Sequence, residues 1–130
     1  MLDGISSSMP PMLKARRIGD KAATVGFDWK RPADVLEKID EELGELRRAL
    51  DDGERQKVKD EFGDLLFAMV MLARKLELDP DSAVERSNLK FRRRFSWMES
   101  ELDRRGIPLD QAGLDLLDQL WDSAKNEPGG

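Results

Sequence analysis

Hydrophobic and polar positions alternate along most of this chain with the period of an amphipathic helix. The clearest pattern follows Pro32, where apolar residues recur at spacings of one, three and four: Val35, Leu36, Ile39, Leu43, Leu46 and Leu50. Proline is favoured in the first turn of a helix, and the pair Asp52-Gly53 is typical of a helix end. The pattern therefore predicts a helix from Pro32 to this pair, with one face buried.

The same periodicity and its interruptions divide the rest of the chain into helices and short connections. Further helices are predicted at about 11–24, 54–77, 80–105 and 110–125. The remaining segments are an irregular lead-in at 1–10, a connection at 26–32 with Trp29 as its anchor, and a flexible tail at 127–130. No strand pattern is found, so we expect a single all-α domain over residues 11–126.

The second half of the helix predicted at 54–77 is apolar on nearly all sides. Such a helix is buried on several sides, which a chain of 130 residues can hardly achieve as a monomer. We therefore expect this segment to form the core of a homodimer. Its apolar run, residues 65–73, is much shorter than the ~20 residues that span a bilayer, and no membrane partner is expected.

Composition narrows the possible chemistry. The chain has no cysteine, histidine or tyrosine, which excludes disulfides, a Ser-His-Asp triad, a cysteine nucleophile and zinc sites built on thiolate or imidazole. Carboxylates remain, and these hard oxygen ligands suit Mg²⁺, Mn²⁺ or Ca²⁺. The net charge of −5 argues against a nucleic-acid partner. The N-terminus lacks the features of a signal peptide, so a cytoplasmic protein is predicted.

Two pairs of acidic residues are the strongest candidates for a site. The pairs are Glu42 with Glu45 and Glu61 with Asp64. At about 100° per residue, the first pair borders the apolar stripe of its helix, and the second pair lies side by side on the next helix. Antiparallel neighbours can present all four acids to one cleft, where repulsion and lost hydration favour a divalent cation. A solvated acidic face with lysine partners is the alternative, and spacing alone leaves it open.

Lysines and glycines surround these acids. Lys38 and Lys57 each stand one turn before an acid, where they can orient a carboxylate or contact an anionic substrate. Gly44 and Gly63 each lie inside an acid pair in mid-helix, where glycine costs up to ~1 kcal/mol relative to alanine. They either allow a neighbouring helix or a ligand to approach, or are tolerated surface glycines.

Cationic and aromatic residues follow in the last two predicted helices. Lys90, Arg93 and Arg94 share one helix face. A cationic cluster opposite an acidic metal site suits a polyphosphate, whereas the alternative is a solvated basic face. Trp121 and Lys125 stand one turn apart, so that Trp121 can stack on a nucleobase with Lys125 near phosphate; packing is the alternative for Trp121.

Together these motifs resemble the MazG family of nucleoside triphosphate pyrophosphohydrolases, whose signature is E-E-x-x-E followed by E-x-x-D. This chain has EELGE at 41–45 and EFGD at 61–64. The similarity continues in KAATVGFDW at 21–29, DLLFAMVMLAR at 64–74, NLKFRRRF at 88–95 and LWDSAK at 120–125. The chain is most similar to the C-terminal of the two MazG-type domains in longer bacterial members.

The resemblance implies a fold, an activity and a set of site residues. The fold would be an all-α bundle of the four-helix type, assembled as an intertwined dimer or a dimer of dimers. Members hydrolyse NTPs or dNTPs to the monophosphate and pyrophosphate with Mg²⁺, for which Mn²⁺ is the alternative. The implied metal ligands are Glu42, Glu45, Glu61 and Asp64, and the implied nucleotide contacts are Lys90, Arg94, Trp121 and Lys125. Lys38, Glu41, Lys57 and Asp60 would lie around the metal ligands.

We hypothesise that Glu41 or Glu45 acts as the general base, that Lys38 and Lys57 also bind substrate, and that the activity serves housecleaning of the nucleotide pool. Three alternatives stay open. One is a non-catalytic helical dimer whose acidic cleft binds a divalent ion or a basic segment of a partner. Another is a hydrolase specific for dUTP or dCTP. The last is a role in lowering the concentration of a signalling nucleotide.

Overall fold

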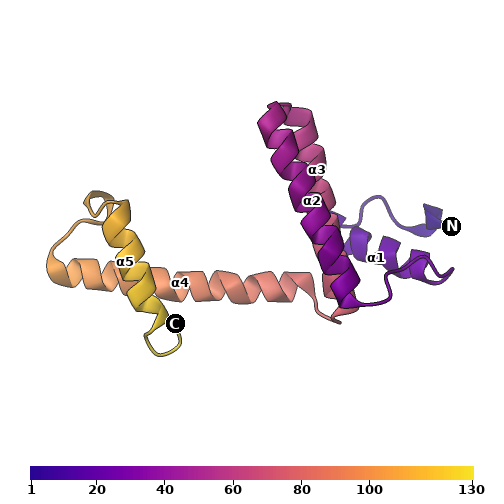
Figure 1. The fold of residues 1–130 in the computed structure, drawn as a ribbon. Coiled ribbons are helices and arrows are strands. Elements are labelled where there is room, and N and C mark those ends of the chain that lie inside the picture. Colours follow the sequence, from indigo (N-terminus) through magenta and orange to yellow (C-terminus); the bar gives the residue numbers. More distant parts are fainter. The chain divides into compact units, whose positions relative to one another are not determined.

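The computed structural model describes the whole chain, residues 1–130, and its regular structure consists of helices only. The α-helices are α1 (Pro11–Ala23), α2 (Pro32–Asp52), α3 (Arg55–Lys75), α4 (Pro80–Arg105) and α5 (Leu114–Lys125) (Figure 1). Short 3-10 helices occur at Leu2–Gly4, inside the lead-in predicted to be irregular, and at Leu109–Gln111. The all-α fold predicted from the sequence is confirmed. None of the helices has the length and apolar character that a bilayer span requires.

The chain forms two compact units, residues 1–80 and residues 81–130. Helices α1, α2 and α3 belong to the first unit, and nearly all of α4 and the whole of α5 belong to the second. Each unit is described by itself below, and the single domain expected over residues 11–126 stays a prediction.

Helices α2 and α3 form an antiparallel hairpin, side by side along their length (Figure 1). The hairpin turns at Gly53, whose φ of 70° and ψ of 13° lie in the left-handed region that only glycine adopts at little cost. Its backbone N–H donates to the carbonyl oxygen of Ala49 at 3.1 Å, which satisfies one carbonyl at the end of α2. The predicted helix end at Asp52-Gly53 is therefore confirmed.

The core of the first unit lies between α2 and α3, and α1 packs against it. Val35, Val70 and Met71 are its buried side chains, and Trp29 packs against them, as expected for the anchor of the connection. Helix α1 approaches closely, since a Cβ atom on Gly19 would lie 2.6 Å from Sδ of Met71. Glycine at this position is what allows the two helices to pack together.

A network of ion pairs attaches the connection between α1 and α2 to the end of α3. The Arg74 guanidinium donates to both carboxylate oxygens of Asp28, at 3.0 and 2.8 Å, and its Nε donates to Asp20 at 2.7 Å. Lys75 Nζ adds a hydrogen bond to Asp28 at 2.8 Å. Such paired hydrogen bonds fix orientation as well as distance, so the segment that carries Trp29 is held against α3.

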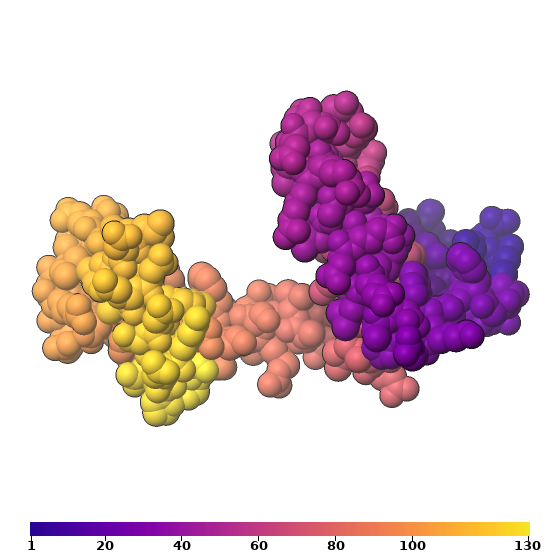
Figure 2. All heavy atoms as spheres, viewed as in Figure 1, coloured from indigo at the N-terminus to yellow at the C-terminus, as the bar shows by residue number.

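In the second unit, α5 packs on the C-terminal half of α4. The buried side chains are Met98 and Leu102 from α4 and Leu120 and Ala124 from α5. Figure 2 shows the yellow spheres of α5 lying against the orange end of α4. The core of this unit follows the apolar spacing of both helices, as amphipathic helices predict.

Part of the apolar surface of α3 is not covered within the first unit. Ala68, Val70 and Met71 are buried, but Leu66 and Met69 of the same helix are exposed, Met69 to 46%. The nearly all-round apolar character predicted for this helix thus corresponds to one buried and one uncovered side. The expected dimer stays a prediction.

Candidate functional site

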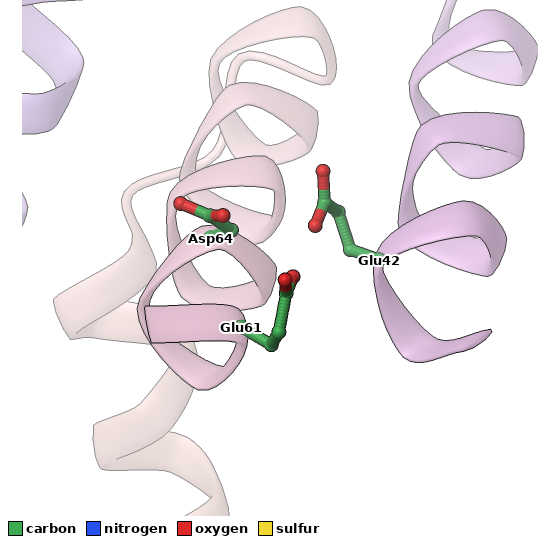
Figure 3. A group of neighbouring side chains, drawn as sticks. All are labelled: Glu42, Glu61 and Asp64. Carbon is green, nitrogen blue, oxygen red and sulfur yellow. The ribbon is translucent and has the colours of Figure 1, made fainter. Parts of the chain in front are cut away.

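Three of the predicted metal ligands come together between α2 and α3. One carboxylate oxygen from each of Glu42, Glu61 and Asp64 lies within 4.8 Å of the others. Figure 3 shows Glu42 and Glu61 reaching toward one another from the two facing helices, with Asp64 one turn further along α3. Closely grouped carboxylate oxygens are the donor set that Mg²⁺ and Ca²⁺ prefer. We refer to these three residues as the acidic group.

Glu42 is the buried member of the acidic group, with 8% of its surface exposed. A buried carboxylate needs a partner to offset the loss of hydration, and Lys38 Nζ lies 3.1 Å from its Oε1. The same ammonium lies 3.3 Å from Oε1 of the exposed Glu41. The pKa of Lys38 is raised by hydrogen bonds to Glu42 first and Glu41 second. Lys38 therefore orients Glu42, one of the two roles that its position suggested.

Glu61 is surrounded by negative charge. Its pKa is raised, first because burial removes hydration and then because of the charges of Asp64, Glu42 and Glu45. Neither Glu61 nor Asp64 pairs with a lysine or arginine side chain. A divalent cation among these oxygens would relieve that repulsion, so the donor set fits the metal ion expected from the sequence.

Glu45 and Glu41, the two candidates for the general base, lie outside the acidic group. The carboxylate of Glu45 accepts a hydrogen bond from the guanidinium of Arg48, while Glu41 faces solvent and pairs with Lys38. Glu45 is still near enough for its charge to raise the pKa of Glu61. Its assignment as a metal ligand and the identity of the base stay predictions.

Lys57 behaves differently from Lys38. Its Nζ lies 3.5 Å from Oε2 of Glu54, the residue before α3, and it makes no ion pair with Glu61. An acid three residues earlier in the chain is a suitable partner for an exposed lysine on a helix. Lys57 therefore does not orient Glu61 in this structure, and its contact with substrate stays a prediction.

In the second unit, the structure brings together two of the four predicted nucleotide contacts. The Arg94 guanidinium lies over the ring of Trp121, 5.2 Å from its centroid, and Phe91 packs against the same ring at 5.0 Å. The Nε atom of Arg94 is buried without a hydrogen-bond partner. Lys125 pairs with Asp122 at 3.6 Å, and Lys90 is exposed.

A cavity of about 480 Å³ in the first unit was not predicted from the sequence. It lies between α1, the connection to α2, α2 itself and α3, and its walls include Phe27, Trp29, Phe67 and Lys38. The sequence offered one sign of such a cavity. The segment GFDW has two aromatic residues in a connection between helices, where the helical periodicity does not explain them.

The fold and the acidic group together define an all-α protein with a carboxylate-rich candidate metal centre. Comparison with protein families then places it: the chain belongs to the family described as the MazG nucleotide pyrophosphohydrolase domain, which matches residues 30–98. This match contains the whole acidic group and both candidate bases, together with Lys38, Lys57, Lys90 and Arg94. Trp121 and Lys125 lie beyond it.

Individual relatives agree with the family. The chain is 45% identical over 121 residues to the nucleoside triphosphate pyrophosphohydrolase/pyrophosphatase MazG of Thermotoga maritima, covering 93% of this chain and 46% of the relative. It is 36% identical over 130 residues to the nucleoside triphosphate pyrophosphohydrolase of Escherichia coli K12, covering 97% of this chain and 49% of the relative. The chain is also 44% identical over 68 residues to the uncharacterized protein YabN of Bacillus subtilis. This match covers 52% of this chain and 14% of YabN. The chain spans about half the length of the first two relatives.

Proposed function

We propose that this chain is a magnesium-dependent nucleoside triphosphate pyrophosphohydrolase, which converts an NTP or dNTP to the monophosphate and pyrophosphate. The observation that carries the proposal is the acidic group, with its oxygens within 4.8 Å of one another and no cationic side chain on Glu61 or Asp64. The MazG family and the names of the relatives support it. We place the activity in the cytoplasm, in the housecleaning of nucleotides.

The acidic group would hold the cation, and Mn²⁺ is the alternative ion for the same oxygen donors. A divalent cation bound there supplies positive charge to the phosphate oxygens and lowers the pKa of a water molecule. Lys38 keeps Glu42 oriented toward the group through their 3.1 Å ion pair. Glu45, or Glu41, accepts the proton of the water that attacks at the α–β linkage. Arg48 donates to Oε1 of Glu45, and the proton would go to the other oxygen of this carboxylate.

We assign the remaining substrate contacts to cationic residues that the resemblance to the family implies. Arg94 and Lys90 neutralise the charge that develops on the pyrophosphate leaving group. Trp121 holds the Arg94 guanidinium, and Lys57 and Lys125 complete the contacts.

Product analysis tests the proposal directly. Several NTPs and dNTPs are incubated with and without Mg²⁺ or Mn²⁺, and the expected products are pyrophosphate and the monophosphate. Glu42→Gln and Asp64→Asn should each lower kcat/KM by at least ~100-fold, because outer-shell changes around a metal already cost 10- to 100-fold. Glu37→Gln is the matched control, since Glu37 is an exposed acid on α2 outside the acidic group.

Other results would contradict the proposal or redirect it. Orthophosphate as the first product excludes a pyrophosphohydrolase. Turnover of dUTP or dCTP alone identifies the narrower hydrolase. Normal folding without turnover, together with binding of a divalent ion, favours the non-catalytic helical dimer.

A further inference from the structure

Helix α1 carries a row of positive charges along one face. Lys14, Arg17 and Lys21 follow one another at spacings of three and four residues, so their side chains are neighbours on the helix surface. None of the three forms a salt bridge. We refer to these residues as the basic face of α1. In a chain with a net charge of −5, unmatched cations side by side create a local positive potential that attracts anions.

The lead-in fixes the two lysines of the basic face. Lys14 Nζ donates to the carbonyl oxygen of Ser7 at 3.1 Å, and Lys21 Nζ donates to that of Met1 at 3.4 Å. Gly4 leaves room for this contact, because an added Cβ atom would lie 2.9 Å from Lys21 Nζ and push it aside. Backbone carbonyls are neutral and an ammonium has three donors. Both lysines are therefore held in place with their charge and further donors still available.

A pocket of about 250 Å³ lies between the lead-in and α1, and two residues of the basic face, Arg17 and Lys21, line it. The Arg17 guanidinium has neither a hydrogen bond nor an ion pair. One acid also lines this lead-in pocket, Asp20, and its Oδ1 already accepts a hydrogen bond from Arg74 Nε at 2.7 Å. The lead-in pocket therefore has an excess of positive charge.

Size and lining indicate which class of ligand the lead-in pocket can take. It is smaller than the ~300–1,000 Å³ typical of sites for drug-sized ligands. No aromatic side chain lines it, so it offers no surface on which a base could stack. A compact anion with several oxygens fits better, since arginine and lysine form charge-assisted hydrogen bonds with phosphate oxygens. The uncharged lining residues are Gly4, Ile5, Met9 and Thr24.

We propose that the lead-in pocket is a site for a phosphate group, bound by Arg17 and Lys21 without a metal ion. The bound phosphate supplies the acceptor that Arg17 lacks. The lead-in is part of the site, because its contact with Lys21 places the ammonium before the ligand arrives, which lowers the entropic cost of binding. The proposed function uses neither residue, so the inference stands apart from it.

Calorimetry without metal tests the site. In buffer freed of metal by a chelating resin, the carboxylates of the acidic group repel anions, so inorganic pyrophosphate should bind in the lead-in pocket. Arg17→Gln and Lys21→Gln should each weaken this binding about 10- to 100-fold, the scale of losing a hydrogen bond to a charged group. Arg47→Gln is the matched control, an exposed and unpaired arginine on α2 outside the pocket. Its affinity should stay within about twofold at ~0.1 M salt, which screens distant charges.

Arg17→Gln keeps the test decisive, since an exposed side chain without a hydrogen bond or ion pair contributes little to folding. Unchanged affinity of this variant, or equal weakening by Arg47→Gln, overturns the inference. So does the absence of binding to the wild-type protein at ~1 mM pyrophosphate. Loss of the metal-free binding in Lys90→Gln but not in Arg17→Gln would assign it to the substrate contacts and also overturn the inference.

ATP in the same metal-free buffer identifies the source of the phosphate group. Tighter binding of pyrophosphate than of ATP, with both weakened by Arg17→Gln, assigns the lead-in pocket to an inorganic anion. Binding of ATP at least as tight as that of pyrophosphate, again weakened by Arg17→Gln, assigns it to the terminal phosphates of a nucleotide whose base stays outside.

Discussion

Asp28 is the residue whose ionisation depends most clearly on tertiary structure. Its pKa is held well below the ordinary value by hydrogen bonds from Arg74, and further by Lys75, against the opposing effect of burial. Because the folded pKa lies below the unfolded one, the stabilisation is complete above the unfolded pKa, ~4, and is lost progressively as the pH falls toward the folded value. Acid should therefore weaken the attachment of the connection to α3.

Asp28→Asn tests this dependence. At pH 7 the substitution should lower the free energy of unfolding by about 2 kcal/mol, the scale of hydrogen bonds to charged groups. The difference from the wild-type protein should shrink as the pH falls below about 4. Urea unfolding of both proteins at pH 7, 5 and 3 measures it. An equal difference at pH 7 and pH 3 would show that the carboxylate charge is not the cause.

At this scale, the sequence predicted which residues share a face but not which partners they choose. Lys38 and Lys57 have the same offset from an acid, yet Lys38 binds Glu42 while Lys57 binds Glu54. Spacing along a helix places several acids within reach of one lysine and does not select among them. Glu42 is buried and gains most from a cation, whereas Glu61 is left to its acidic neighbours.

At the scale of elements, the glycines of the hairpin divide into two kinds. An added Cβ atom on Gly44 or Gly63 meets nothing within 4 Å, so no helix of this chain requires glycine there. Gly53 is equally open, but its φ of 70° is strained for any residue with a Cβ atom. Of the two reasons suggested by the sequence, close approach of a neighbouring helix is thus excluded within the chain.

Alanine substitutions should separate these glycines. Gly44→Ala and Gly63→Ala should each raise the free energy of unfolding by up to ~1 kcal/mol, because alanine is the better helix former. Gly53→Ala should lower it by about 1 kcal/mol through backbone strain. Chemical denaturation of the three variants gives the comparison. Destabilisation by Gly44→Ala would mean that another molecule packs against α2 at this point.

Helix positions were predictable because apolar spacing and terminal proline or glycine agree along this chain. The start of α5 shows where prediction from these signals fails. A continuous helix was expected from residue 110, but Leu109–Gln111 forms a 3-10 turn and α5 begins at Leu114. Gly113 breaks the helix with a φ of 79°. The leucines on which the prediction rested, Leu114, Leu117 and Leu120, all follow this break, so their spacing could not fix where the helix begins.

At the scale of the whole molecule, the uncovered side of α3 supports the homodimer expected from the sequence. Met69 is 46% exposed on a helix whose other side is core, and contiguous apolar exposure of this kind is typical of interfaces. Light scattering should give the mass of a dimer, or of a tetramer as the larger alternative. Met69→Lys should shift the equilibrium toward monomer. Leu2→Lys in the lead-in is the control, and a monomeric wild-type protein would contradict the prediction.

The acidic group was predictable from the sequence and the cavity was not, for a physical reason. The acids lie on two helices joined by one turn, so local periodicity is enough to bring them together. The cavity walls come from α1, a connection, α2 and α3, over residues 18–74. Only tertiary packing through Gly19 and the Asp28–Arg74 pair brings these parts into contact.

The turn at Gly53 also bears on how the protein folds. Glu42 and Glu61 are separated by a short stretch of chain, so closing the loop between them costs little conformational entropy. Contacts of low sequence separation form early and rapidly. The candidate metal centre should accordingly be assembled before α1 docks. A cation that binds only the assembled hairpin would then raise the melting temperature by mass action, even in a variant that cannot hydrolyse nucleotides.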